Sequence, residues 1–132
     1  MSAPIITIID YGMGNTWSVM SAFKYLGAKV KLVSDPEEIS RSSVLILPGV
    51  GSFKSGMESL RCSNIDESII DAVTNKGAKI LGICLGMQLL GSHSTEGGKT
   101  DGLGLLSNQV ERFTSIETDG LKVPHVGFNS LH

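Results

Sequence analysis

The stretch KILGICLGMQLL, residues 79–90, decides the fold class of this 132-residue sequence. Residues 79–83 form a short aliphatic run of the kind that makes a buried strand, and residues 85–90 begin a buried helix. Cys84 lies between them and has a glycine two positions away on each side. A strand that turns directly into a helix, with glycines that permit a tight backbone, predicts a nucleophile elbow at the carboxyl end of the strand.

The chain before this stretch also alternates strand and helix. Helices are predicted to begin after Asn15, which can cap one, at Pro36, and at about Asn64. Unbroken aliphatic runs predict strands that are buried on both faces of a parallel sheet. They cover residues 4–9, 30–33, 44–47 and 79–83. We therefore expect an α/β fold with an open, mostly parallel, flavodoxin-like sheet and helices on both faces.

The chain after residue 90 follows a different pattern. Residues 91–104 are polar and rich in glycine, which predicts a loop. Residues 109–113 and 121–123 predict strands with no helix between them, so a hairpin or an extension of the sheet is expected there. No internal repeat and no low-complexity linker interrupts the sequence, and we expect one domain over residues 1–132.

Composition limits the possible partners. The net charge is −2 and 18% of the residues are charged, with no long run of one sign, so nothing indicates a nucleic acid or an anionic membrane as partner. The first ten residues lack the basic and cleavage features of a signal peptide, and a cytoplasmic protein is expected. Cys62 and Cys84 match no spacing of paired metal ligands, so neither a metal site nor a disulfide is predicted.

Cys84 is the candidate nucleophile. The strained turn would hold its thiol clear of the sheet, and the amide of Leu85 could donate to the oxyanion that forms when the thiol attacks a carbonyl. The alternative is a buried, unreactive cysteine, which is common in general. The flanking glycines and the start of a helix favour the nucleophile.

A second loop is predicted on the same edge of the sheet. Pro48-Gly49-Val50-Gly51 follows the strand at residues 44–47, and its glycines could turn a backbone amide toward a substrate oxygen beside Cys84. An ordinary turn is the alternative for this loop. Residues 10–15 lack the third glycine of a dinucleotide fingerprint and the lysine of a P-loop, so they predict a tight turn with Asn15 as a cap.

A thiol nucleophile normally needs a histidine as its base. Three histidines are available. His93 is predicted in an exposed polar loop, and His125 and His132 lie near the last residue, where a surface role is favoured. These residues predict a nucleophile without an evident base.

Four blocks together resemble the triad, or class I, glutamine amidotransferases. The likeness spans the whole chain, and within the family it is greatest to the glutaminase subunits of imidazole glycerol phosphate synthase. The blocks are DYGMGN at 10–15, PGVG at 48–51, GICLGMQ at 82–88 and PHVGFN at 124–129.

The resemblance implies a reaction and a set of site residues. Cys84 would attack the side-chain amide of glutamine, form a glutamyl thioester and release ammonia for a (β/α)-barrel synthase partner in histidine biosynthesis, with no cofactor. Gly51 and Leu85 would form the oxyanion hole, and Gly49, Val50 and Gln88 would bind the substrate. The residues implied to contact the synthase are Pro124, His125, Phe128 and Asn129.

The resemblance also implies what this chain lacks. The family's catalytic histidine and its acidic partner come after the position of His132, so we expect the N-terminal two-thirds of the domain, with the C-terminal part of the fold missing and little activity. A shortened sheet predicts self-association. Val126 and Phe128 stand where methionine and tryptophan are usual. That change leaves open a subunit that serves a sugar-modifying synthetase in surface polysaccharide synthesis.

Two other interpretations belong to different classes of protein. One is a non-catalytic module that docks to a synthase without supplying ammonia. The other is a complete small flavodoxin-like hydrolase with a reactive cysteine, in which the block at 124–129 would have no purpose.

Overall fold

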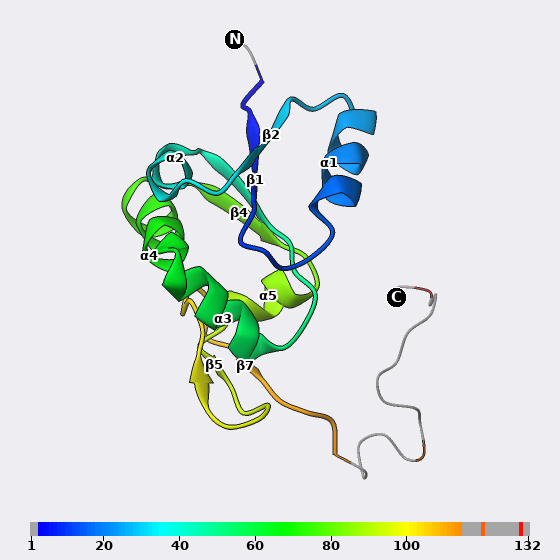
Figure 1. Cartoon of the computed structure of the whole chain (residues 1–132), viewed down its shortest axis with the longest axis vertical. Coiled ribbons are helices and arrows are strands. Elements are labelled where there is room, and N and C mark those ends of the chain that lie inside the picture. The colour runs from blue at the N-terminus through cyan, green and yellow to red at the C-terminus, as the bar shows by residue number, and fades with distance from the viewer. Residues whose placement is uncertain (1–2, 115–119, 121–129, 131–132) are drawn as a thin grey trace.

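A four-stranded parallel sheet forms the centre of the protein, in the order β2-β1-β3-β4 (Figure 1). The computed structural model describes residues 3–114, 120 and 130. The strands are β1 (Ile6–Ile9), β2 (Val30–Val33), β3 (Val44–Leu47) and β4 (Lys79–Gly82). All four lie within the aliphatic runs of the sequence, so the predicted parallel α/β sheet is confirmed.

Helices cover both faces of this sheet, as predicted. Helix α1 lies on one face, and α2 and α4 pack against each other on the opposite face (Figure 1). The helices are α1 (Thr16–Tyr25), α2 (Pro36–Arg41), α3 (Phe53–Cys62), α4 (Ile65–Ile70), the π-helical turn η1 (Asp71–Asn75) and α5 (Leu85–Leu89). The predicted caps are present, because the Asn15 side chain accepts from the Ser18 amide and the Asp35 side chain accepts from the Glu37 amide.

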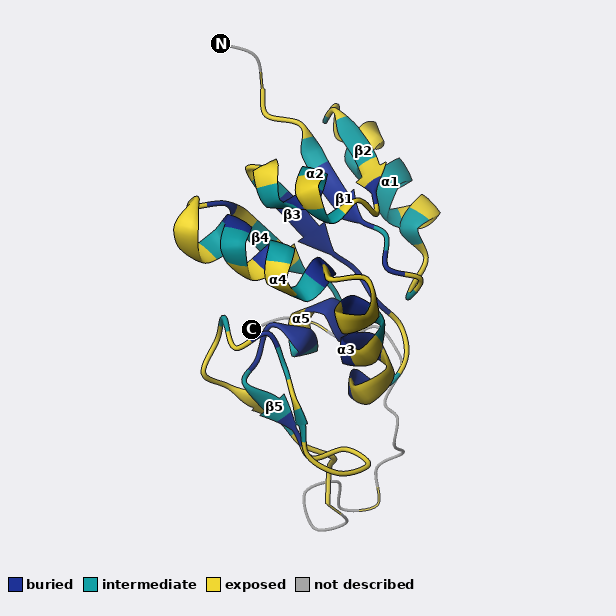
Figure 2. Cartoon of the chain, turned by 60° about the vertical axis from the view of Figure 1, so that its left-hand side comes forward, coloured by how far each residue is buried: buried dark blue, intermediate teal, exposed yellow. Residues whose placement is uncertain are grey.

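The hydrophobic core lies between the sheet and the helices on the side of α3 and α4 (Figure 2). Helix α3 buries one complete stripe, and β3 is buried along most of its length. The largest core side chains are those of Ile9, Ile39, Leu45, Leu47, Phe53, Met57, Leu60, Ile65, Ile69 and Leu89. Helix α1 contains no buried residue, which leaves Trp17 and Tyr25 exposed.

The structure corrects the prediction in two places. Helix α3 was not predicted at all, although its buried residues recur at helical spacing. Residues 91–104, predicted as a loop, contribute the two-residue strands β5 (His93–Ser94) and β6 (Thr100–Asp101). With β7 (Gln109–Val110) they form a second sheet in the order β6-β5-β7. Strands this short depend on pairing with their neighbours, and pairing leaves little trace in local sequence.

Strand β7 begins where a strand was predicted, but it pairs in parallel with β5. The second predicted strand of the hairpin, residues 121–123, lies outside the described residues. No helix in the described part of the chain is long and apolar enough to cross a bilayer.

Candidate active site

Cys84 occupies a strained turn between β4 and α5. Its backbone has φ 54° and ψ −120°, a combination that residues with a side chain rarely adopt. The turn is held on both sides, because the Ile83 amide donates to the Leu47 carbonyl at 2.9 Å and the Met87 amide donates to the Cys84 carbonyl at 3.0 Å. The thiol is exposed. Backbone strain fixed in this way is typical of functional sites, and the turn has the geometry of a nucleophile elbow.

Gly86 allows α5 to begin directly against the end of β3. A Cβ atom at this position would lie 1.7 Å from the Leu47 carbonyl oxygen and 3.1 Å from that of Pro48. Because only glycine fits, the first turn of α5 sits close to the backbone of the neighbouring strand. This contact brings Cys84 beside the loop that follows β3.

The loop after β3, Pro48–Gly51, contacts the nucleophile turn through a backbone hydrogen bond. The Leu85 amide donates to the Gly49 carbonyl at 3.2 Å, so this amide is not free in the observed conformation. A substrate oxygen can accept from Leu85 only after the Gly49 carbonyl turns away. Gly51 has φ +129°, which a residue with a side chain would adopt only under strain.

A cavity of about 380 Å³ opens beside the thiol. This volume lies within the range of small-molecule sites. The residues that line it are Gly49, Val50, Gly51, Cys84, Leu85, Met87 and Gln88. The structure therefore brings together all six residues that the sequence predicted for this part of the site. Met87 was not predicted, although it precedes Gln88 on the same short helix.

Sequence reasoning also missed Tyr11, in the loop after β1. Its hydroxyl donates to the Pro48 carbonyl at 2.6 Å, and the side chain is buried. Burial raises the pKa of the Tyr11 phenol, so the hydroxyl stays protonated and remains a donor even at mildly alkaline pH. The sequence predicted only a tight turn here. Its signal was an aromatic residue in a glycine-rich loop at the carboxyl edge of the sheet.

Not one of the described residues that line the cavity is a histidine. His93 lies in β5, half-buried, with its Nδ1 atom 3.0 Å from the Ser92 hydroxyl, so the prediction of an exposed loop residue was wrong. Cys62, at the last position of α3, is exposed. His132 and the predicted synthase-contacting residues Pro124, His125, Phe128 and Asn129 lie outside the described residues.

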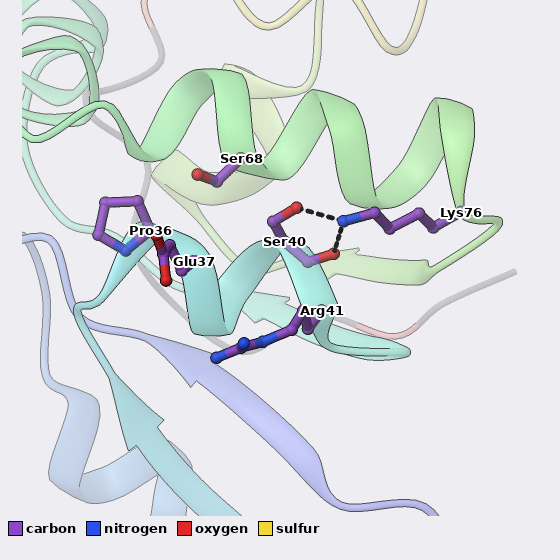
Figure 3. Close-up of a pocket in the computed structure, with 6 residues that line it drawn as sticks. All are labelled: Pro36, Glu37, Ser40, Arg41, Ser68 and Lys76. Carbon is purple, nitrogen blue, oxygen red and sulfur yellow. Dashed lines mark hydrogen bonds between the residues drawn. The ribbon is translucent and has the colours of Figure 1, made fainter.

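A second hollow lies between α2 and the helix formed by α4 and η1 (Figure 3). Two of the residues that line it, Ser40 and Lys76, bond to each other. The Lys76 ammonium donates to the Ser40 hydroxyl at 2.6 Å and pairs with Asp71 at 2.9 Å, and the Ser40 hydroxyl donates to Asp71 at 2.6 Å. This network joins α2 to the helix formed by α4 and η1. Within the described ranges, no three His, Cys, Asp or Glu side chains cluster as metal ligands would.

Comparison with known proteins identifies the family. Residues 7–130 match the family "Glutamine amidotransferase class-I". The chain belongs to this family. A solved structure described as a glutamine amidotransferase superposes with a TM-score of 0.67 at 24% identity, covering 80% of this chain and 56% of that chain. A putative peptidase E from Listeria monocytogenes superposes with a TM-score of 0.64 at 14% identity, covering 80% of this chain and 64% of that chain. At these identities, both solved structures support the fold alone.

Two curated relatives of this amidotransferase chain are described as imidazole glycerol phosphate synthase subunit HisH or HisH 1. This chain is 50% identical over 129 residues to imidazole glycerol phosphate synthase subunit HisH from Geobacillus sp. (strain WCH70), and the match covers 96% of this chain and 61% of the relative. It is 48% identical over 128 residues to subunit HisH 1 from Legionella pneumophila (strain Lens), covering 96% and 60%. The chain thus spans about three-fifths of the length of the curated relatives it matches.

Proposed function

We propose that this chain carries the nucleophilic part of a glutaminase site, in which Cys84 attacks the side-chain amide of glutamine. The observation that carries the proposal is the exposed thiol on a strained elbow, facing a cavity lined by the Gly49–Gly51 loop and Gln88. Membership of the class-I amidotransferase family supports the choice of glutamine as substrate.

The reaction proceeds through a covalent intermediate. The Cys84 thiol gives up its proton to the group that serves as base, and its sulfur forms a bond to the amide carbon of glutamine while the carbonyl oxygen becomes an oxyanion. The amides of Leu85 and Gly51 are the proposed donors to this oxyanion, once the Gly49 carbonyl releases Leu85. The carbon–nitrogen bond then breaks, the nitrogen takes up a proton and leaves as ammonia, and water hydrolyses the glutamyl thioester to glutamate.

The proton steps need a group beyond the described lining of the cavity. Among those lining residues only Cys84 and Gln88 carry polar side chains, and a glutamine amide neither takes up nor releases a proton at neutral pH. Gln88 is suited instead to hold the substrate by hydrogen bonds, because its amide can both donate and accept. The apolar side chains of Val50 and Met87 border the cavity and can pack against the methylene groups of glutamine.

Ammonia is proposed to pass to a synthase subunit that makes imidazole glycerol phosphate in histidine biosynthesis. The shared name of the curated relatives supports this partner, and the proposed form of the partner is a (β/α)-barrel cyclase. The contact residues proposed for it are Pro124, His125, Phe128 and Asn129. The proposed location of the complex is the cytoplasm.

The test is covalent labelling followed by intact mass measurement. The protein is treated with a glutamine-analogue chloroketone, with and without excess glutamine, and Cys84→Ser serves as the control. Cys62 is a matched internal control, because it is the other exposed thiol of the same chain. We expect one adduct, at Cys84, that glutamine suppresses.

Three results would count against the proposal. Equal labelling of Cys62 and Cys84 would mean that exposure alone sets reactivity. Labelling of Cys84 that glutamine does not suppress would mean that the cavity does not bind the substrate. An adduct that persists in Cys84→Ser would place the reactive group elsewhere.

A further inference from the structure

Tyr11 lies beneath the glycine loop of the candidate site. Its side chain is only 5% exposed, and its hydroxyl donates to the carbonyl of Pro48, 37 positions along the chain. The backbone of Tyr11 is held from the other direction, because the Ser59 hydroxyl of α3 donates to the Tyr11 carbonyl. Tyr11 therefore connects a core helix to the first peptide of the Pro48–Gly51 loop.

The hydroxyl of Tyr11 also limits the space around Gly49. A Cβ atom on Gly49 would lie 2.3 Å from the Tyr11 oxygen and 3.0 Å from the Leu85 Cβ atom. The backbone of Gly49 is thus enclosed between the phenol and the first residue of α5. Because the Pro48 carbonyl and the Gly49 amide belong to one planar peptide, a hydrogen bond to that carbonyl also fixes the direction of the amide.

The neighbours of Tyr11 contact the rest of the same loop. A Cβ atom on Gly14 would lie 3.0 Å from the Gly49 Cα atom, and one on Gly51 would lie 2.8 Å from the Met13 methyl group. The loop after β1 therefore packs against the loop after β3 at Gly49 and Gly51. Of these contacts between the two loops, the one at Tyr11 is a buried hydrogen bond.

We propose that Tyr11 is a positioning residue for the oxyanion-binding loop, which fixes the Pro48–Gly49 peptide while the following peptides present their amides to the substrate oxygen. The inference rests on the proposed function and assigns a role to a residue that does not line the cavity. Tyr11 acts through the glycine loop. Its loss affects the step in which negative charge develops on the substrate oxygen, more than the intrinsic reactivity of the thiol.

The experiment compares two reagents on the same thiol. A glutamine-analogue chloroketone places a carbonyl where the substrate amide carbonyl would lie, whereas iodoacetamide alkylates an exposed thiol without using the substrate site. Second-order rate constants for Cys84 are measured with both reagents in the wild type, in Tyr11→Phe and in Tyr25→Phe. Tyr25 is the matched control, because it is 90% exposed on α1.

For Tyr11→Phe we expect the chloroketone rate to fall about five- to tenfold, the size of one lost hydrogen bond, and the iodoacetamide rate to stay within about twofold. Tyr25→Phe should change neither rate. The phenol acts as a neutral donor, so the ratio of the chloroketone rate to the iodoacetamide rate should be the same from neutral to mildly alkaline pH. An unchanged ratio of the two rates in Tyr11→Phe would overturn the proposal.

Folding and the proposed function are controlled separately. Far-UV circular dichroism checks that Tyr11→Phe is folded. If it is not, Ser59→Ala, which removes only the bond to the Tyr11 carbonyl, replaces it, and a wild-type ratio in that variant overturns the proposal. Wild-type labelling that glutamine fails to suppress refutes the glutaminase site itself. If glutamine suppresses the labelling but Tyr11→Phe leaves the ratio of the chloroketone rate to the iodoacetamide rate unchanged, only the role of Tyr11 is refuted.

Discussion

Replacing Gly86 by alanine should disrupt the nucleophile turn more than any other single methyl group added to the candidate site. The new Cβ atom would lie 1.7 Å from the Leu47 carbonyl oxygen, whereas real Cβ atoms essentially never come within 3.0 Å of such an atom. The obstructing atom belongs to the backbone of the central strand β3, which cannot rotate away as a side chain would. The first turn of α5 therefore has to move.

The size of the effect follows from this displacement. Overpacking of a well-packed region costs about 1–3 kcal/mol of folding free energy. Moving α5 also lengthens the 3.2 Å hydrogen bond from the Leu85 amide to Gly49 and shifts the Cys84 thiol relative to the cavity. Misplacing a reacting group by about 1 Å can reduce a rate about 100-fold. We expect the chloroketone to label Cys84 at least about tenfold more slowly in Gly86→Ala.

Two measurements and one matched variant separate stability from geometry. Urea unfolding gives the free energy of unfolding, and intact mass gives the labelling rate under conditions where each variant is folded. Gly27→Ala is the control, because Gly27 follows α1, has φ +83° and has open space around its Cβ position. Its backbone strain costs about 1–2 kcal/mol. It should therefore lower stability to a similar degree without slowing the labelling of Cys84.

The reasoning fails if Gly86→Ala retains both wild-type stability and the wild-type labelling rate. It also fails if Gly27→Ala slows labelling as strongly as Gly86→Ala, because the effect would then follow stability and not the position of α5. A loss of stability with unchanged labelling would show that the helix moves without carrying the thiol.

Three further predictions concern the rest of the molecule. Asn15→Ala removes the cap of α1 and should lower the free energy of unfolding by about 1 kcal/mol in urea; an unchanged midpoint would contradict this. Hydrogen bonds from Ser40 and its neighbours hold the pKa of Asp71 well below its usual range. The unfolded chain therefore binds more protons than the folded chain in acid, and the destabilisation caused by Asp71→Asn should be full above about pH 4 and shrink below it in pH-dependent unfolding. Exposed apolar side chains such as Trp17 and Tyr25 predict self-association at micromolar concentration, and light scattering that finds only monomers across that range would refute it.

The parallel sheet could be predicted from sequence because its strands are contiguous aliphatic runs. Helix α3 is harder to predict, because Gly56 and two serines reduce its helix propensity although its buried residues recur at helical spacing. Its stability comes instead from burying Phe53, Met57 and Leu60 on the side that packs against α4 and α5. Gly56 belongs to the same stripe, because a Cβ atom there would lie 3.1 Å from a Leu89 methyl group. A residue that weakens the helix locally thus permits its close packing.

The candidate site likewise has one part that could be predicted from the sequence and another part that could not. Cys84 and the loop 48–51 could be predicted because they follow neighbouring parallel strands, whose carboxyl ends share one edge of the sheet. Gln88 was implied only by the resemblance to the class I amidotransferases. The contact between Tyr11 and Pro48 could not be predicted, since it joins residues 37 positions apart and depends on how two loops pack. For the same reason the sequence suggested a free Leu85 amide, whereas in the fold that amide already has an acceptor.

The loop 48–51 is held unequally along its length, and this bears on how the proposed reaction could begin. Pro48 is buried and bonded to Tyr11, whereas Val50 is 67% exposed. When a substrate oxygen replaces the Gly49 carbonyl at the Leu85 amide, one hydrogen bond is exchanged for another of the same kind, so the net cost of the exchange is small. What remains is the rotation of a peptide that follows a glycine, which has more conformational freedom than any other residue. A loop anchored at Pro48 and free at Val50 can therefore respond to substrate without disturbing the strand that carries it.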